Sequence, residues 1–287
     1  MKGDRLARQI THATRAVGKT YDFDHGHDNQ RPIDFWFQET YEGLVLFVVF
    51  YTMACRYSAC IGCNLPATSS LKHVDFRDIM KQIDHLFDDQ KIIDKLDRVR
   101  KVIVSNQGSV LDEETLSSTA LMYLIAKINM HVLQLSVLSL ETRPEYIDSA
   151  ELEFLARAIK EAHSDGATVE IAIGFEIFDE DLRNRVFRKG LSFEAFERVV
   201  ELVSHHGFRL KCYFMQKPVP GMTDDQGIAD IHAGIAYLDK MARQYGVPIN
   251  MHLNPTYVAH GTPLEEAFNA GTFAAPRLSD VAKAALR

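Results

Sequence analysis

Apolar runs rich in β-branched and aromatic residues recur along the chain from residue 44 onward, and stretches with a different rhythm separate them. Runs of this composition and length predict strands, over residues 44–50, 102–105, 132–140, 168–175, 209–215 and 249–253. Most positions in these runs are apolar on both faces, which is typical of parallel strands that are covered on both sides.

The stretches between the runs show the periodicity of amphipathic helices. In the clearest one, apolar residues recur at a spacing of about 3.6, at Val74, Phe76, Ile79, Ile83, Leu86 and Phe87. Further helices are predicted over residues 114–131, 150–163, 193–205, 227–245 and 264–270. Gly166, Gly207 and Gly246 stand just before the last three strands, where a helix-ending residue is expected.

Strands that alternate with helices predict a parallel sheet, and right-handed crossovers curl such a sheet toward a barrel. Because the sequence shows six strand–helix units where a closed barrel has eight, we predict an α/β fold, an open, partial (βα)6 TIM-type barrel. We expect a short N-terminal extension over residues 1–43 and one core domain over residues 44–287, since no Pro-, Gly- or Ser-rich linker divides the chain.

A polar or unusual segment follows each predicted strand. These segments are the cysteine-containing loop after residue 50, then residues 106–109, 141–145, 174–176, 216–218 and 254–257. The carboxyl ends of parallel strands meet at one edge of the sheet, and functional residues gather there. The sequence therefore predicts a site at this edge.

Composition narrows the possible functions. The chain has 287 residues with a formal net charge of −7, and no run of basic residues exceeds two, which weakens the case for general binding to nucleic acid. The longest apolar stretch is too short to span a bilayer, and the N-terminus lacks the apolar core of a secretory signal. With four cysteines in the whole chain, we expect a reducing, cytoplasmic location and no membrane contact.

Three of those cysteines, Cys55, Cys60 and Cys63, follow the first predicted strand at C-x4-C-x2-C spacing. Three thiolates can ligate three irons of a [4Fe–4S] cluster and leave the fourth iron open to a reacting ligand. A different interpretation is a structural zinc site in which a histidine such as His73 joins the cysteines, although a second C-x2-C pair is missing.

The cysteine spacing resembles that of the radical S-adenosylmethionine (SAM) superfamily. Residues 140–145, Leu-Glu-Thr-Arg-Pro-Glu, are similar to the segment after the third strand in the core shared by the Elongator catalytic subunit and methylthiotransferases. Residues 187–193 and 213–218 resemble the radical-SAM subunit of archaeosine synthase and its bacterial relatives. The likeness covers about residues 44 to 262. The sequence differs from the superfamily pattern at two points. Four residues separate the first two cysteines, where most members have three, and Gly62 precedes the last cysteine, where many members have an aromatic residue.

This resemblance implies that the three cysteines hold a [4Fe–4S] cluster and that SAM binds its open iron. It further implies reductive cleavage of SAM to a 5′-deoxyadenosyl radical that takes hydrogen from a substrate, with electrons from a flavodoxin- or ferredoxin-type donor. SAM contacts are expected from the loops after strands two to four, at Asn106, Gln107, Gly108, Ser109, Glu141, Arg143, Glu176, Arg188 and Lys189.

The remaining candidates concern the substrate. Lys217, Asn254 and Tyr257 are expected to border the substrate space, and Glu176 is a candidate for contact with SAM or substrate. Cys212, within the fifth predicted strand, is either a hydrogen-atom donor or, more commonly for a cysteine among apolar residues, part of the core. We expect a radical SAM enzyme for a small-molecule or natural-product substrate. A tRNA-modifying enzyme or subunit, help to a partner subunit, and a non-catalytic SAM-binding module remain alternatives.

Overall fold

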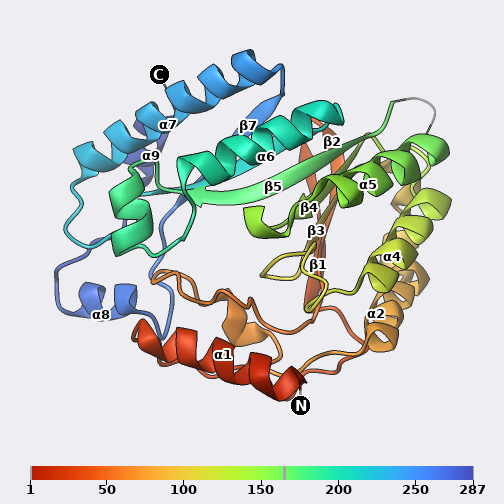
Figure 1. Ribbon diagram of the computed structural model, residues 1–287, viewed down its shortest axis with the longest axis horizontal. Helices are drawn as coiled ribbons and strands as arrows, with labels where there is room; N and C mark the ends of the chain where they lie inside the picture. The colour runs from red at the N-terminus through yellow and green to blue at the C-terminus, as the bar shows by residue number, and fades with distance from the viewer. Residues whose placement is uncertain (1, 164–165, 287) are drawn as a thin grey trace.

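A curled, open sheet forms the centre of the molecule (Figure 1). The computed structural model describes residues 2–163 and 166–286. Within that part of the chain the sheet has seven strands in sequential order, and all neighbours are parallel except β1 and β2. The strands are β1 (Asp34–Thr40), β2 (Gly43–Val49), β3 (Val99–Ser105), β4 (Val137–Glu141), β5 (Thr168–Glu176), β6 (Arg209–Gln216) and β7 (Ile249–Pro255).

Helices cover the outer face of the sheet, and a separate pair lies across the molecule from them (Figure 1). The outer layer includes α2 (Phe76–Asp88), α3 (Gln90–Ile93), α4 (Ser118–His131), α5 (Ser149–Ala162), α6 (Phe193–His205), α7 (Asp224–Tyr245) and α9 (Leu278–Ala285). The separate pair is α1 (Lys2–Ala16) and α8 (Pro263–Asn269). No helix in residues 2–163 and 166–286 is long and apolar enough to cross a membrane.

The open, partial barrel and its six parallel strands are confirmed. The third predicted strand starts later than residue 132, at Val137, because Val132 caps α4 through a bond from its N–H to the Ile128 carbonyl. The helix before it begins at Ser118 and not at residue 114, since the Ser117 side chain accepts a hydrogen bond from the Ala120 N–H and so caps the helix there.

The first 43 residues contain two regular elements that the sequence pattern did not predict. Strand β1 pairs antiparallel with β2, and Trp36 stacks on Phe47 with ring centroids 4.3 Å apart. Helix α1 buries Ile10 in a cluster with Met53 and Ala54, which directly precede the first cysteine of the loop. The extension therefore belongs partly to the sheet and partly to the support of the cysteine loop.

The two faces of the sheet differ sharply in polarity. On β6, Leu210, Cys212 and Phe214 point outward into the main apolar core, where Phe214 stacks on Phe175 with centroids 4.9 Å apart. The alternate residues of the strand point inward, beginning with Arg209. The outer face thus supplies the packing energy, and the inner face carries the polar groups.

A layer of four charges lies on the inner face near the amino ends of the strands. The Lys101 ammonium lies 2.8 Å from both Glu42 and Glu170, and the Arg209 guanidinium lies 2.5 Å and 2.7 Å from the same two carboxylates. Burial alone would raise the pKa of Glu170, but Lys101 and Arg209 outweigh it and hold that pKa below its usual value. Two negative and two positive groups therefore balance inside the barrel.

We expect Glu170→Ala to lower the free energy of unfolding by about 3–5 kcal/mol, because it leaves the buried Lys101 and the partly buried Arg209 with Glu42 as their one remaining carboxylate in this layer. Urea denaturation followed by circular dichroism measures the change, with Glu194→Ala on the exposed first turn of α6 as the matched control. Equal midpoints for the two variants would contradict a structural role for the charged layer.

Candidate active site at the carboxyl ends of the strands

Backbone strain is concentrated in the loops that follow the strands. Among the described residues, the non-glycine positions with positive φ are Ser58, Gln107, Glu176, Arg188 and Lys217, at +48° to +72°. They lie at or beyond the carboxyl ends of β2, β3, β5 and β6. Side chains adopt this conformation at an energetic cost, and such residues cluster at functional sites. The strain marks the edge where the sequence predicts the site.

The three cysteines lie in one loop that is fixed at several points. The Cys63 N–H bonds to the Cys60 carbonyl at 3.3 Å, and the Ile61 N–H bonds to the Phe187 carbonyl at 3.0 Å. The Ser58 hydroxyl donates to the Cys55 carbonyl. All three thiols are free and half-buried. The loop after β2 is therefore held against the loop after β5.

The three thiols do not form a metal-binding arrangement in this structure. Across residues 2–163 and 166–286, no three His, Cys, Asp or Glu side chains come together in a way that could hold a metal ion. This statement applies equally to a zinc site with His73. The thiols are nevertheless close enough for electrostatic coupling, because charges on Cys55 and Cys60 raise the pKa of Cys63.

Three buried or half-buried cations surround this loop. Burial raises the pKa of the Cys60 thiol, whereas Lys189 and Arg143 oppose that effect. Burial also raises the pKa of Cys63 to about 11, and Lys19 opposes it. The fully buried Lys19 ammonium donates to the Ser58 carbonyl at 2.8 Å. Sequence reasoning missed Lys19, since an isolated lysine in a polar extension carries no signal.

A buried tyrosine near the cysteine loop also suits a sulfur-rich metal cluster. The Tyr21 hydroxyl is buried and has no hydrogen-bond partner of good geometry among the described residues, although the Thr14 side chain is near enough to lower its pKa. Burial raises the pKa of Tyr21, and charges on the three cysteines raise it further. The hydroxyl therefore lies close to the cysteine loop. Cationic neighbours and hydrogen-bond donors stabilise the negative charge of a thiolate-ligated cluster. The residues present therefore fit a [4Fe–4S] group.

Arg143 joins the loops after four different strands. Its backbone N–H bonds to the Ser109 Oγ at 3.0 Å, and its guanidinium donates to the Lys189 carbonyl at 3.1 Å and to Glu145 at 2.5 Å. The guanidinium also lies 3.8 Å from the centroid of the Tyr57 ring, within the cysteine loop. The predicted Arg143 thus acts in this structure as a connector.

Lys189 and Arg188, the two candidate carboxylate contacts, point in different directions. The Lys189 ammonium is largely buried and lies 2.9 Å from the Glu176 Oε1, whereas Arg188 is exposed and its carbonyl accepts from the Tyr57 hydroxyl. A bulge in β5 places Glu176 on this side, and a Cβ on Gly174 would lie 2.3 Å from the Glu176 Oε1. The structure therefore brings Lys189 and Glu176 together at the site and directs Arg188 away.

Glu141 lies inside the barrel at the end of β4. Its Oε1 accepts a hydrogen bond from the Tyr213 hydroxyl at 2.6 Å, and Ser105 also bonds to it. Burial raises the pKa of Glu141, while Ser105, Tyr213 and the charge of Lys211 act against that rise. The proposed contact with a ribose remains a prediction.

The turn after β3 is largely self-contained. The Asn106 amide donates to the Ser109 carbonyl at 3.2 Å and accepts from the Gly108 N–H at 3.1 Å. Gln107 accepts from Thr68 at 2.6 Å. Gly108 packs directly on the cysteine loop, since a Cβ there would lie 3.1 Å from the Cys55 Cα. This turn therefore positions the first cysteine, and its contacts with SAM remain predictions.

The candidate substrate residues are placed differently from one another. Lys217 is buried and forms an ion pair with Asp224, 2.7 Å away at the start of α7. Tyr257 is half-exposed, and its pKa is raised by burial and by charges on Cys63 and Glu176, so it borders the site. Cys212 lies in the outer core, with no exposed surface, which disfavours a role as hydrogen-atom donor.

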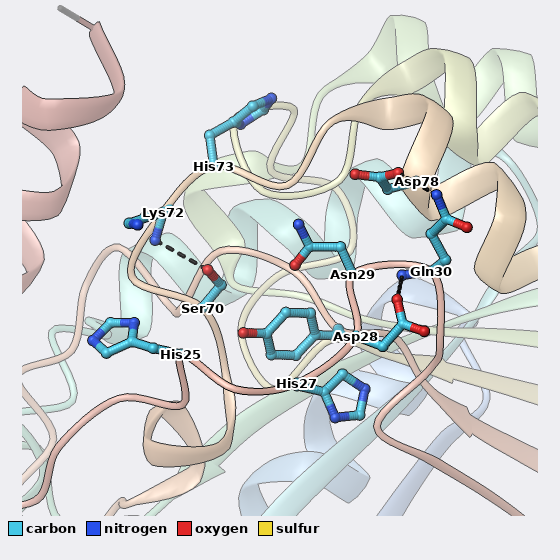
Figure 2. A pocket seen from close by; sticks show the side chains of 10 residues that line it. His25, His27, Asp28, Asn29, Gln30, Ser70, Lys72, His73 and Asp78 are labelled. Atoms are coloured by element: carbon cyan, nitrogen blue, oxygen red, sulfur yellow. Dashed lines mark hydrogen bonds between the residues drawn. The ribbon is translucent and has the colours of Figure 1, made fainter.

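Two hollows on the described surface lie outside this site. Figure 2 shows one, a polar pocket of about 470 Å³ between the extension and the segment before α2, where His25, His27 and His73 face the same space. A second pocket of about 540 Å³, rich in carboxylates, lies between the starts of α4 and α5 and includes Arg56. Neither pocket is lined by a cysteine.

Comparison with known proteins gives remote matches. No family model matches the chain. The uncharacterized protein MJ0550 of Methanocaldococcus jannaschii is 27% identical over 213 residues, which cover 71% of this chain and 56% of that protein. Archaeosine synthase subunit beta of Thermococcus kodakarensis is 22% identical over 243 residues, covering 82% and 69% respectively. The chain thus spans little more than half the length of the first relative.

Comparison with solved structures also gives remote matches. Queuine lyase from Clostridium spiroforme, solved with SAM and queuine, matches with a TM-score of 0.49 and 18% identity, over 82% of this chain and 87% of that chain. The radical SAM methyltransferase TsrM from Kitasatospora setae matches with a TM-score of 0.48 and 17% identity, over 78% and 39%. The chain resembles radical SAM enzymes. The likeness to radical SAM enzymes agrees with the resemblance expected from the cysteine spacing, and the superfamily, the reaction and the substrate remain proposals.

We expect Gly108→Ala to reduce the iron content of reconstituted protein at least twofold, because the added methyl group lies 3.1–3.3 Å from the Cα and Cβ of Cys55 and displaces that ligand. Iron analysis per chain measures the effect. Gly26→Ala is the matched control, since its Cβ would meet only ordinary van der Waals contact. Full iron loading in both variants would show that this packing does not position Cys55.

Proposed function

We propose that this protein is a radical SAM enzyme with a single [4Fe–4S] cluster held by Cys55, Cys60 and Cys63. The observation that carries the proposal is the convergence of the cysteine loop with the Lys189–Glu176 pair at the carboxyl edge of an open α/β barrel. Cys212, the fourth cysteine, faces the outer core and does not supply a fourth ligand. One corner of the cluster is therefore left for SAM.

A cluster held by these three cysteines would supply the electron for reductive cleavage of SAM, and with it the means to abstract hydrogen from a substrate. In this proposal Lys189 binds the SAM carboxylate, and Glu176 orients the Lys189 ammonium and contacts the SAM amino group. Gly108 and its turn hold Cys55 in place. Arg143 fixes the loops around the site and, together with the buried Lys19, balances the negative charge of the ligated thiolates.

The substrate is proposed to be a small molecule or natural product. The net charge of −7 supports this over a polynucleotide substrate, whereas the likeness to an archaeosine synthase subunit supports tRNA modification as the alternative. The electron donor is proposed to be of flavodoxin or ferredoxin type, and a partner subunit is compatible with the partial length match to the relatives. A reducing cytoplasm suits the four free thiols.

Oxygen-free reconstitution tests the cluster. We expect wild type to bind about four iron atoms per chain and to turn brown, and Cys60→Ala to lose most of that iron. Cys212→Ala is the matched control, because it removes a thiol from the outer core and should keep the iron. Iron-free wild type that instead retains zinc would overturn the proposal.

Addition of dithionite and SAM to the reconstituted protein tests the reaction. We expect release of 5′-deoxyadenosine by wild type and by Cys212→Ala, but not by Cys60→Ala. Liquid chromatography with mass spectrometry quantifies the product. An iron-loaded wild type that binds SAM and releases no 5′-deoxyadenosine would identify a binding module and contradict an enzyme.

A matched pair of variants tests the SAM contact. We expect Lys189→Met to weaken SAM binding at least tenfold, about 1.4 kcal/mol, because it removes a buried cation at the site. Arg188→Met should change the affinity less than twofold, since Arg188 points to solvent. Calorimetric titration of iron-matched samples measures both, and equal affinities would refute the assignment of Lys189.

A further inference from the structure

A buried lysine on the inner face of the barrel has no charged partner. Lys211 is the third residue of β6 and only 8% exposed. Within residues 2–163 and 166–286, its ammonium makes no hydrogen bond or ion pair. It lies 5.3 Å from the centroid of the Tyr213 ring, and the carboxylates of Glu170, Glu141 and Glu42 are near enough for their charges to act on its pKa. Burial of an ammonium without a compensating partner is costly, so this arrangement calls for an explanation.

The carboxylates around Lys211 are already engaged. Glu42 and Glu170 are shared by Lys101 and Arg209, which makes that layer neutral without Lys211. Glu141, the next carboxylate toward the carboxyl ends, accepts from Tyr213 and Ser105. Burial, followed by repulsion from Lys101, lowers the pKa of Lys211, as expected for an ammonium that lacks a close counter-charge.

The inner face around Lys211 is lined by polar and small residues. The register places Ala172 of β5 and Asn250 of β7 beside Lys211, and Gly174 and His252 beside Tyr213 one layer further up. His252 is exposed, and its ring meets that of Tyr213 edge-on at 5.3 Å. Ala172 is buried, and the side chains of Glu176 and Lys189 occupy the space above Gly174. The side of this face that reaches solvent is therefore the β7 side, at the exposed His252.

We propose that Lys211 binds an anionic group of the substrate, a carboxylate or a phosphate, on the inner face of the barrel. The inference rests on the proposed function, because a substrate bound in the barrel would react with the radical that the proposed enzyme forms at the cysteine edge. An ammonium with three donors and no protein acceptor suits oxygen anions of either kind. The register places two further polar side chains nearby: the exposed imidazole of His252 and the amide of Asn250, which also donates to the Tyr41 hydroxyl at 3.1 Å.

The position of Lys211 also constrains the length of the substrate. Strands rise about 3.3 Å per residue, so Lys211 lies about 13 Å along β6 from Met215, near the carboxyl edge. The flexible lysine side chain spans part of that distance. A substrate anchored at Lys211 therefore presents its reacting C–H group to the cysteine edge when the two groups are on the order of 10 Å apart. This describes a small acid or phosphate ester, or the terminal unit of a larger one.

Anion binding can be measured on the iron-free protein with defined probes: acetate, phosphate and the neutral acetamide, at constant ionic strength. We expect acetate or phosphate, but not acetamide, to raise the thermal midpoint of wild type and of the control Lys240→Met, which changes an exposed lysine on α7. The shift should disappear in Lys211→Met. Comparison of acetate with phosphate identifies which anion the site prefers. Equal shifts in all three proteins, or none in wild type, would overturn the proposal.

A second measurement needs no variant and therefore does not depend on how Lys211→Met folds. Acetylation of Lys211 in wild type by acetic anhydride, mapped by peptide mass spectrometry, should slow about tenfold when the preferred probe is present at ten times its dissociation constant. The rate at Lys240 should not change. An unprotected Lys211 would exclude anion binding there.

The outcomes separate this inference from the proposed function. Lys211→Met should keep wild-type affinity for SAM and wild-type iron content, because Lys211 lies in the barrel and not at the cysteine edge. A large loss of SAM affinity would show that Lys211 binds SAM, and would overturn its assignment to the substrate. Anion binding by a protein that proves unable to cleave SAM would refute the proposed function and leave the anion site standing.

Discussion

The buried Arg143 is the residue on which the arrangement of the candidate site depends. Its stack on Tyr57 reaches the cysteine loop, its backbone contact with Ser109 reaches the turn after β3, and its bond to the Lys189 carbonyl reaches the loop after β5. Each of these loops contains a non-glycine residue with positive φ: Ser58, Gln107 and Arg188. Charge-assisted bonds from a planar, rigid donor are directional, so one residue can set the mutual position of three loops.

The alternation of side chains along a strand lets the same residues build a stable protein and a reactive interior. On β6 the outward positions join an apolar core, while the inward positions run from the paired Arg209 through the unpaired Lys211 to Tyr213. At the amino end of the barrel the charged layer pairs its four charges with one another, whereas Lys211 in the middle has no ion-pair partner. The polar groups of the inner face are therefore paired with one another at the amino end of the barrel and less fully paired toward the carboxyl end.

The parallel strands and the loop positions could be predicted because apolar runs and helical periodicity are local signals. Strand β1 was missed because an edge strand with one exposed face has a weak apolar pattern, as the alternating exposure of Asp34–Thr40 shows. Lys19 and Tyr21 were missed for a different reason. Their importance arises from long-range packing against the cysteine loop, which no short sequence window contains. The opposite orientations of Lys189 and Arg188 likewise depend on backbone geometry, including the left-handed conformation of Arg188.

The position of α1 has a consequence for maturation. The segment that follows α1 bonds to both the early and the late parts of the chain, through Lys19 to Ser58 and through the Thr20 N–H to the Gly261 carbonyl at 2.9 Å. During synthesis this segment emerges long before its second partner does. The bond to Gly261 can form only after β7 has been made, so the anchoring of this segment beside the cysteine loop is completed late in chain synthesis.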